Sequence, residues 1–440
     1  MNFYLKCANA LKFLRGKKGN FKTILFGLLQ KKELSKAEFQ KAYSILIRTA
    51  SNMDLIDHLV QHLEDSEKGM NIKNKDLIRI LLSELFLGKY KKIKGGGKLK
   101  KMIMSKAELL DKEFQRLKQQ HGIKDEEEEQ DKGIIRKRVF LRIIKGRMNI
   151  EDVVKDLTLD GEAPLIDPLI PNLLSLTYPQ YQALRKKEDY ITSKNYIIQS
   201  KPSCVPAYLL CKGILENKDR IAKKIDIIDA CSAPGNKTAQ LAEYWPSGKI
   251  FAIERDQKRY NLLRKRMEFY DLKNVECIND SFLNIKPEDQ KFSNVRYILL
   301  DPTCSGSGMI NNLDSNIDNL IEMSYEEYCK KKFESLDKKK KAELYALQKS
   351  QLELLDHASK FPNVLRISYS TCSIYEVENE QVVKLFLESH PNFELVNLEK
   401  YSETKGFSTN FSEGYKCLRA DPRESGMDGF FVSIFKRRKN

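Results

Sequence analysis

The segment Ile225–Thr238, with the sequence IDIIDACSAPGNKT, decides the fold of this chain. An apolar run of strand length ends at Asp229, and a turn containing Gly235 then leads into a segment with helical spacing. A strand that enters a helix through a glycine-bearing turn lets backbone N–H groups approach a ligand closely. The segment lacks the two glycines and the Gly-Lys-Thr ending of a P-loop, so it is not predicted to cradle phosphates.

Further strands and helices alternate after this segment. Apolar or β-branched runs lie at residues 249–253, 275–278, 297–300 and 364–369, and helical segments at 238–244, 258–269, 323–359 and 376–389 separate or follow them. Strands that alternate with crossover helices predict a parallel, doubly wound α/β sheet of the Rossmann-like type. The runs Phe393–Leu398 and Gly429–Phe435 can add antiparallel strands at one edge.

Acidic residues stand at the ends of four consecutive predicted strands, namely Asp229, Glu254, Asp280 and Asp301. Such residues converge on the crevice where open α/β sheets bind ligands, and Glu254 follows Gly235 by 254 − 235 = 19 residues, a spacing that suits ribose hydroxyls. Carboxylates repel a pyrophosphate but suit a cationic sulfonium and an ammonium, which favours S-adenosylmethionine over NAD. The alternative is that these residues only cap helices and turns.

Two cysteines follow the fourth and fifth predicted strands. Cys304 lies in DPTCSGSG and Cys372 in STCS, both polar loops rather than the apolar runs typical of a buried structural cysteine. A thiolate that adds to carbon 6 of cytosine makes carbon 5 nucleophilic toward a methyl group, and a carboxylic acid at Asp301 could stabilise that adduct at ring nitrogen 3. A second thiol can aid the final elimination, and the base must be single-stranded or flipped to reach such a site. The spacing alone leaves open which cysteine has which role.

Composition limits the partner and the compartment. The chain has 440 residues, enough for two or three domains, and a net charge of 77 − 61 = +16, which predicts a polyanionic partner such as nucleic acid or an anionic membrane. No apolar run approaches the roughly 20 residues that span a bilayer, and no secretory signal is evident, so an intracellular protein is expected. The nine cysteines are irregularly spaced and no histidine flanks one at ligand spacing, so neither a disulfide framework nor a metal site is predicted.

The same patterns divide the chain. Residues 1–124 are predicted to form a basic, all-helical domain, with helical spacing at 21–29, 39–46, 55–63 and 77–87 and a lysine cluster at 91–101. Residues 125–133 are predicted to form an acidic linker, and residues 134–200 a small α/β unit. Residues 201–440 are expected to form the Rossmann-like methyltransferase domain.

Three motifs carry a family resemblance. DACSAPGNKT from Asp229, DPTCSGSG from Asp301 and YSTCSIYEVENE from Tyr369 resemble those of the Nop2/Sun, or Fmu-like, RNA cytosine-C5 methyltransferases. With residues 199–206 and the closing LRADPRESGMDGFF, the resemblance covers residues 136–435. The MNFY start, Asn236 in APGNKT and Thr303 in DPTC are similar to the branch that acts on large-subunit ribosomal RNA.

The resemblance implies a role for each motif residue. Cys372 would be the nucleophile, Cys304 would assist release of the product, and Asp301 would lie beside the methyl group and the base. Glu254, longer than the usual aspartate, would hold the ribose. Thr303 replaces the usual proline. The remaining predicted cofactor residues are Cys231, Ser232, Ala233, Pro234, Gly235, Asn236 and Lys237 around the methionine portion, Arg259 in the pocket wall and Asp280 at the adenine.

The leading hypothesis is therefore an S-adenosylmethionine-dependent cytosine-C5 methyltransferase of large-subunit rRNA. It implies a monomer that acts on rRNA or pre-ribosomal particles in the nucleus and nucleolus. The basic N-terminal helices and the small α/β unit at 134–200 would bind RNA phosphates, with the lysine cluster and the basic tail at 436–439 as candidate contacts. Methylation of transfer RNA is an alternative, because the catalytic motifs do not read the substrate. A non-catalytic ribosome-assembly factor is another, although both cysteines and Asp301 are present.

Overall fold

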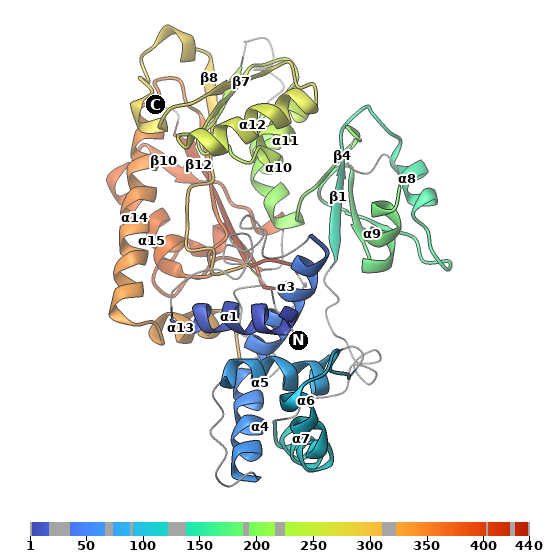
Figure 1. The fold of residues 1–440 in the computed structure, drawn as a ribbon. Coiled ribbons are helices and arrows are strands. Elements are labelled where there is room, and N and C mark those ends of the chain that lie inside the picture. Colours follow the sequence, from blue (N-terminus) through green and yellow to red (C-terminus); the bar gives the residue numbers. More distant parts are fainter. Residues whose placement is uncertain are drawn as a thin grey trace. The chain divides into compact units, whose positions relative to one another are not determined.

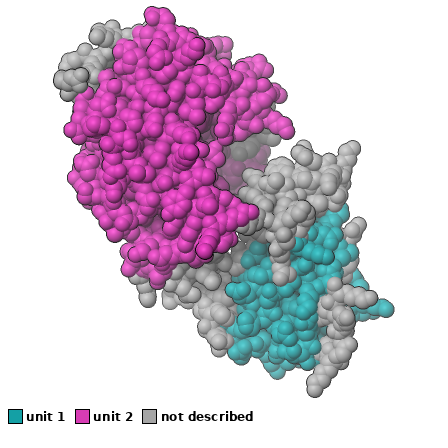
Figure 2. All heavy atoms as spheres, turned by 90° about the vertical axis from the view of Figure 1, so that its left-hand side faces the viewer, with its two compact units in different colours: residues 1–134 teal, residues 135–440 magenta. Residues whose placement is uncertain are grey.

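The computed structural model describes residues 2–16, 36–66, 74–88, 91–121, 138–187, 193–215, 225–309, 323–401, 404–422 and 427–438. The chain forms two compact units, residues 1–134 and 135–440 (Figure 2). The predicted helix over residues 21–29 and the acidic stretch at 125–131 lie outside the described residues. No helix in the described ranges is both long and apolar enough to cross a membrane.

The described part of the first unit is helical. The predicted amphipathic pattern produces one core, to which α4 contributes apolar residues three and four apart, including Leu55, Leu59 and Leu63. The lysines before α6 are exposed, whereas Ile93 among them is buried. The helices are α1 (Asn2–Gly16), α3 (Lys36–Ser51), α4 (Met53–Ser66), α5 (Lys75–Leu82), the π-helical turn η1 (Ser83–Leu87), α6 (Lys98–Ser105) and α7 (Ala107–His121).

The second unit begins with a small antiparallel sheet in the order β2-β3-β1-β4. On β1, the buried Arg142 forms an ion pair of 2.6 Å with Glu243 of the following sheet domain, which ties the two parts together. The elements are β1 (Val139–Ile143), α8 (Ile150–Asp156), β2 (Leu165–Ile166), β3 (Leu173–Leu176), α9 (Tyr178–Arg185) and β4 (Tyr196–Ile198).

The rest of the unit is the predicted doubly wound sheet, in the order β10-β12-β9-β8-β5-β6-β7, with β11 paired to β12 (Figure 1). The five central strands from β9 to β7 are parallel, and β12, β10 and β11 are antiparallel, which confirms the α/β fold class. The strands are β5 (Asp226–Asp229), β6 (Ile250–Ile253), β7 (Val275–Ile278), β8 (Val295–Leu300), β9 (Arg366–Thr371), β10 (Phe393–Leu395), β11 (Leu418–Ala420) and β12 (Phe430–Arg437).

Helices cover both faces of this sheet (Figure 1). Alternate strand residues face opposite sides: Ile227 packs with α10 and α11, whereas its neighbour Ile228 packs with α14 and α15. The predicted helical stretch 323–359 is two helices, because the Asp337 side chain accepts a hydrogen bond from the Lys340 N–H and caps a new start. The helices are α10 (Lys201–Leu215), α11 (Asn236–Tyr244), α12 (Gln257–Phe269), α13 (Tyr325–Glu334), α14 (Lys338–Ser359) and α15 (Glu380–Ser389).

The strand order fixes the position of the site. The chain leaves β5 to build β6 and β7 on one side and returns to build β8 and β9 on the other, so β5 and β8 are neighbours at the topological switch point. Loops that leave the carboxyl ends of these two strands diverge there and open a crevice. The motifs beginning at Asp229 and Asp301 therefore lie on either side of one crevice.

Candidate active site

The turn after β5 is built on short polar contacts. The Ser232 hydroxyl donates to the carbonyl of Asp229 at 2.7 Å, and Thr238 Oγ1 donates to Asp229 Oδ2 at 2.7 Å. Gly235 caps α11 with φ +103°, and a Cβ there would lie 2.8 Å from a carbon of Met267. Only glycine fits this turn without strain. The turn therefore brings the backbone at the N-terminus of α11 close to the crevice.

The loop after β6 directs a carboxylate toward the same crevice. Glu254 is buried, its Oε1 accepts the Asp256 N–H at 2.9 Å, and its Oε2 lies 3.6 Å from Arg259 Nη2. Arg259 also donates to the carbonyl of Ala233 at 2.6 Å. These contacts connect the second strand end to the turn after the first.

A cavity of about 520 Å³ lies between these loops and the motifs after β8 and β9. Seven predicted site residues line it, together with Phe282, Leu283 and Gln351, which the sequence analysis did not single out. The Asp280 carboxylate instead accepts from the Ser281 N–H, next to the wall. The predicted lining residues are Cys231, Ala233, Glu254, Arg259, Asp301, Cys304 and Cys372; Ser232, Pro234, Gly235, Asn236, Lys237 and Asp280 do not line it.

Asp301 is held from two sides. Lys237 Nζ lies 2.7 Å from Asp301 Oδ2 and 3.0 Å from Ser203 Oγ, and the Ser370 hydroxyl donates to Asp301 Oδ1 at 2.7 Å. Burial alone would lower the pKa of Lys237, but the neighbouring Asp301 carboxylate raises it overall, so the ammonium form is favoured. The contact from Ser370, which lies inside the motif YSTCSIYEVENE, was not predicted from the sequence.

The two motif cysteines meet at the wall of the cavity. Cys304 Sγ lies 3.1 Å from Cys372 Sγ. The hydrogen bond from Cys304 lowers the pKa of Cys372, and the same bond together with burial raises the pKa of Cys304 well above its usual value. Cys372 is therefore the sulfur that favours the thiolate, with the Cys304 thiol as donor. By contrast, burial raises the pKa of Cys231 to about 12, as expected for a packing residue.

Hydroxyl groups join the two cysteine loops. Ser373 Oγ lies 3.2 Å from Ser305 Oγ and 3.1 Å from Ser307 Oγ, and the Gly308 N–H donates to the carbonyl of Cys372 at 2.9 Å. The buried Glu378 accepts the Ser305 N–H at 2.9 Å. The serines of both motifs therefore set the distance between the loops.

The comparisons with known proteins agree with this geometry. A family model described as 16S rRNA methyltransferase RsmB/F matches residues 215–436, which include every motif of the crevice. The chain belongs to the RsmB/F methyltransferase family. This confirms the resemblance found in the three motifs, and it makes the chain an RNA methyltransferase whose cofactor is S-adenosylmethionine.

Two full-length relatives carry more specific names. The 25S rRNA (cytosine-C(5))-methyltransferase rcm1 of Schizosaccharomyces pombe is 31% identical, over 98% of this chain and 91% of that protein. The 28S rRNA (cytosine-C(5))-methyltransferase of Mus musculus is 30% identical, over 99% of this chain and 91% of that protein.

Solved structures agree at the level of the fold. The crystal structure of PH0851 has a TM-score of 0.63 and 21% sequence identity, and it covers 99% of this chain and 98% of its own. A methyltransferase homologue from Pyrococcus horikoshii has a TM-score of 0.50 and 20% identity, over 87% of this chain and 99% of that one. The fold of this chain therefore resembles these two solved structures over most of its length.

Proposed function

We propose that this enzyme methylates carbon 5 of a cytosine in large-subunit ribosomal RNA, with Cys372 as the nucleophile and Cys304 as the residue that assists release. The 3.1 Å contact brings the two sulfurs close enough to share one proton, which either sulfur could donate. The hydrogen bond from Cys304 and the nearby Lys237 ammonium lower the pKa of Cys372, which supports a thiolate on Cys372 and a thiol on Cys304. The division agrees with that implied by the family motifs.

The reaction has three stages: a thiolate adds to the cytosine ring, the activated ring is methylated, and the thiolate is eliminated. The Cys372 sulfur adds to carbon 6 of the base, and the electron pair of the 5,6 double bond moves into the ring toward nitrogen 3. Asp301 lies beside the cavity and is held by Lys237 and Ser370, so a proton passed to it from the Lys237 ammonium would let its carboxyl group donate to nitrogen 3 and stabilise the adduct. Carbon 5 then takes the methyl group. A base then takes the proton from carbon 5, the electron pair of that C–H bond restores the double bond, and the Cys372 sulfur leaves as a thiolate. Cys304 can assist as this base once its own thiol has lost its proton.

The residues of the crevice fit S-adenosylmethionine, which supplies the methyl group when bound. The cavity of about 520 Å³ lies within the usual range for ligand pockets of about 300–1,000 Å³. Glu254 offers a buried carboxylate for ribose hydroxyls, and Asp301 offers a negative charge near a sulfonium. Phe282 and Leu283 add an apolar wall suited to an adenine ring. Asp280 would act from the edge of this wall, through the Ser281 backbone that it fixes.

Large-subunit rRNA is the proposed substrate because both full-length relatives are named for it. The chain has a net charge of +16, and exposed lysines lie within residues 91–101. These positive charges would attract the phosphates of RNA. We propose that the enzyme acts as a monomer on rRNA or pre-ribosomal particles in the nucleus and nucleolus, where large-subunit rRNA would be its substrate.

Covalent trapping tests the proposal. The Cys304→Ala enzyme, incubated with total RNA and S-adenosylmethionine, is expected to retain RNA through denaturation, and the double Cys304→Ala, Cys372→Ala enzyme is not. Cys277→Ala is the matched control, because this half-buried cysteine on β7 lies outside the cavity lining, and it should turn over like the wild type.

Three other outcomes of the trapping experiment would each overturn a different part of the proposal. Methylation by the wild type without an adduct in Cys304→Ala would show that the two roles are wrongly assigned. Bisulfite sequencing of the trapped RNA identifies the substrate, and a transfer RNA would overturn the rRNA assignment. Salt-sensitive RNA binding with neither methylation nor adduct would favour the non-catalytic assembly factor.

A further inference from the structure

A completely buried ion pair lies behind the loop that carries Cys372. Arg419 on β11 and Glu380 at the start of α15 both have side chains with 0% exposure. Arg419 Nε donates to Glu380 Oε1 at 2.7 Å and Nη2 donates to Oε2 at 2.6 Å, a bidentate arrangement. Stability alone does not explain such a pair, because apolar residues of similar volume often stabilise a core equally well.

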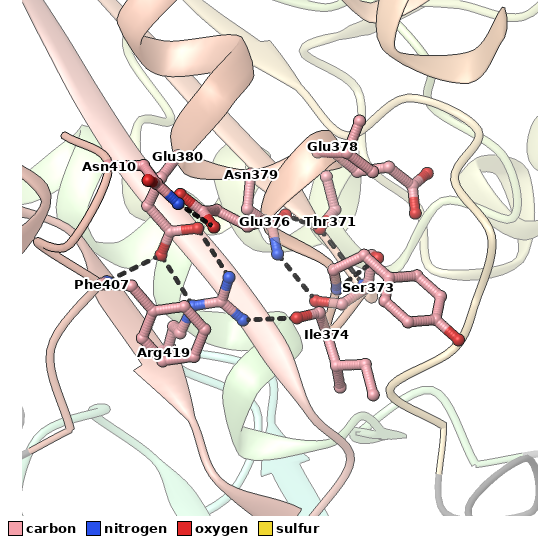
Figure 3. Close-up of polar contacts among 12 residues, drawn as sticks. Thr371, Ser373, Ile374, Glu376, Glu378, Asn379, Glu380, Phe407, Asn410 and Arg419 are labelled. Carbon is pink, nitrogen blue, oxygen red and sulfur yellow. Dashed lines mark hydrogen bonds and ion pairs between the residues drawn. The ribbon is translucent and has the colours of Figure 1, made fainter. Parts of the chain in front are cut away.

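The ion pair connects three segments of the chain (Figure 3). Arg419 Nη1 donates at 3.0 Å to the carbonyl of Ile374, two residues after Cys372. Glu380 Oε1 also accepts the Phe407 N–H at 2.9 Å, and the guanidinium lies 3.8 Å from the centre of the Phe407 ring. The guanidinium is thereby fixed on several sides, and its third nitrogen, Nη1, donates to the nucleophile loop.

The residue before Glu380 holds the same loop. Asn379 Nδ2 donates to the carbonyl of Ser373 at 2.9 Å, and Asn379 Oδ1 accepts the Thr371 hydroxyl at 2.5 Å (Figure 3). The two carbonyls that follow Cys372 are thus each held by a buried side chain. Because β9 ends at Thr371, the strand ladder does not fix the path of the loop, and these side chains hold its far side while Gly308 and the motif serines hold the side toward Cys304.

We propose that Arg419 and Glu380 are positioning residues for the nucleophile: they hold the loop so that Cys372 Sγ stays within hydrogen-bonding distance of Cys304 Sγ. This role rests on the function proposed above, because Cys372 is the nucleophile there. Neither residue lines the cavity, so both act through the loop and not on the substrate. A displaced loop would weaken the bond that lowers the pKa of Cys372.

The pH dependence of Cys372 alkylation by iodoacetamide, measured by peptide mass spectrometry, tests this role. Arg419→Lys keeps a positive charge beside Glu380, but a single ammonium nitrogen cannot replace the three guanidinium nitrogens that reach Glu380 and Ile374. We expect the midpoint of the alkylation profile to move to higher pH. Below the midpoint, the rate falls about tenfold for each unit by which the pKa of Cys372 rises. The kcat for methylation should fall as well, while the RNA dissociation constant stays unchanged.

Arg437→Lys is the matched control. Arg437 also donates to backbone carbonyls, those of Val364 at 3.0 Å and Ser359 at 2.7 Å, but it lies near the opposite end of β9 from Cys372. This variant should lower the unfolding temperature and leave the alkylation profile of Cys372 unchanged. If Arg419→Lys gives the wild-type profile as well, Arg419 has only a structural role and the proposal is overturned.

A double variant covers the case in which Arg419→Lys does not fold. Arg419→Met combined with Glu380→Met leaves no unpaired buried charge, so the core should still form. A raised alkylation midpoint in the folded double variant supports the proposal, and a wild-type midpoint overturns it. Alkylation needs neither RNA nor cofactor, so it remains readable even if the trapping experiment overturns the proposed function.

Discussion

The Nζ atom of Lys237 lies 2.7 Å from Oδ2 of Asp301, so the first helix after the cofactor turn is ion-paired with the end of β8 across the topological switch point. The same ammonium lies 5.4 Å from the ring centre of Phe430. The family motif suggested a place for Lys237 around the methionine portion of the cofactor. In the structure it contacts Asp301, Ser203 and Phe430, on the side of the two cysteines.

Lys237→Met should therefore lower the rate of methylation more than cofactor affinity. Loss of the ammonium leaves Asp301 without its cation and removes one of the charges that lower the pKa of Cys372. We expect a fall of about 100-fold in single-turnover rate, equivalent to about 3 kcal/mol in the activation barrier. Lys249→Met, which removes an exposed surface ion pair with Glu276, is the control and should react like the wild type. Equal losses in both variants would contradict a special role for Lys237.

The coupling of the two sulfurs predicts how reactivity depends on pH. The thiolate of Cys372 forms as pH rises through its pKa, which the hydrogen bond from Cys304 lowers below the usual 9.0. In Cys304→Ala that donor is lost, so the alkylation midpoint of Cys372 should move to higher pH. Iodoacetamide labelling across pH 6–10 measures it. A midpoint that does not move would show that the hydrogen bond does not activate Cys372.

Asp229 should make stability fall as pH rises. Burial raises the pKa of its carboxyl from 3.8 to about 7, so the folded state keeps this proton where the unfolded state has lost it. This contribution to the free energy of unfolding is fully present below about pH 4. It is lost as the pH rises from 4 to 7, by about 1.4 kcal/mol for each pH unit. Asp229→Asn keeps an acceptor for Thr238 and removes this dependence. Urea unfolding at pH 5 and 8, followed by the fluorescence of the single tryptophan, Trp245, should show a smaller change in the variant than in the wild type.

Gly235→Ala should destabilise the cofactor turn through both strain and collision. The position has φ +103°, and a Cβ would lie 2.8 Å from Met267 and 2.9 Å from Leu263. Gly146→Ala provides the control, because Gly146 has φ +80° but no atom within 4 Å of the added carbon. We expect a loss of about 1 kcal/mol for Gly146→Ala from backbone strain alone, and a larger loss for Gly235→Ala. Calorimetry should also show weaker S-adenosylmethionine binding for Gly235→Ala alone.

The five parallel strands and their acidic ends could be predicted because the signals are local. Apolar runs of strand length, glycine turns and helical spacing act over a few residues, and the run from Ile225 leads into its turn by sequence alone. The break between α13 and α14 was missed because the lysines after Asp337 continue a helix-forming composition, whereas the cap at Asp337 depends on one side-chain contact.

The sequence by itself determined the strands, the motif residues at their ends and the family, and it placed Cys304 and Cys372 at one edge of the sheet. Only the tertiary structure decided that their sulfurs lie 3.1 Å apart, that Lys237 pairs with Asp301, and that Arg419 supports the nucleophile loop. The physical reason is sequence separation. These partners lie 45–68 residues apart, and their contacts exist only because β8 pairs with β9 and β5, and because β11 packs beside β12.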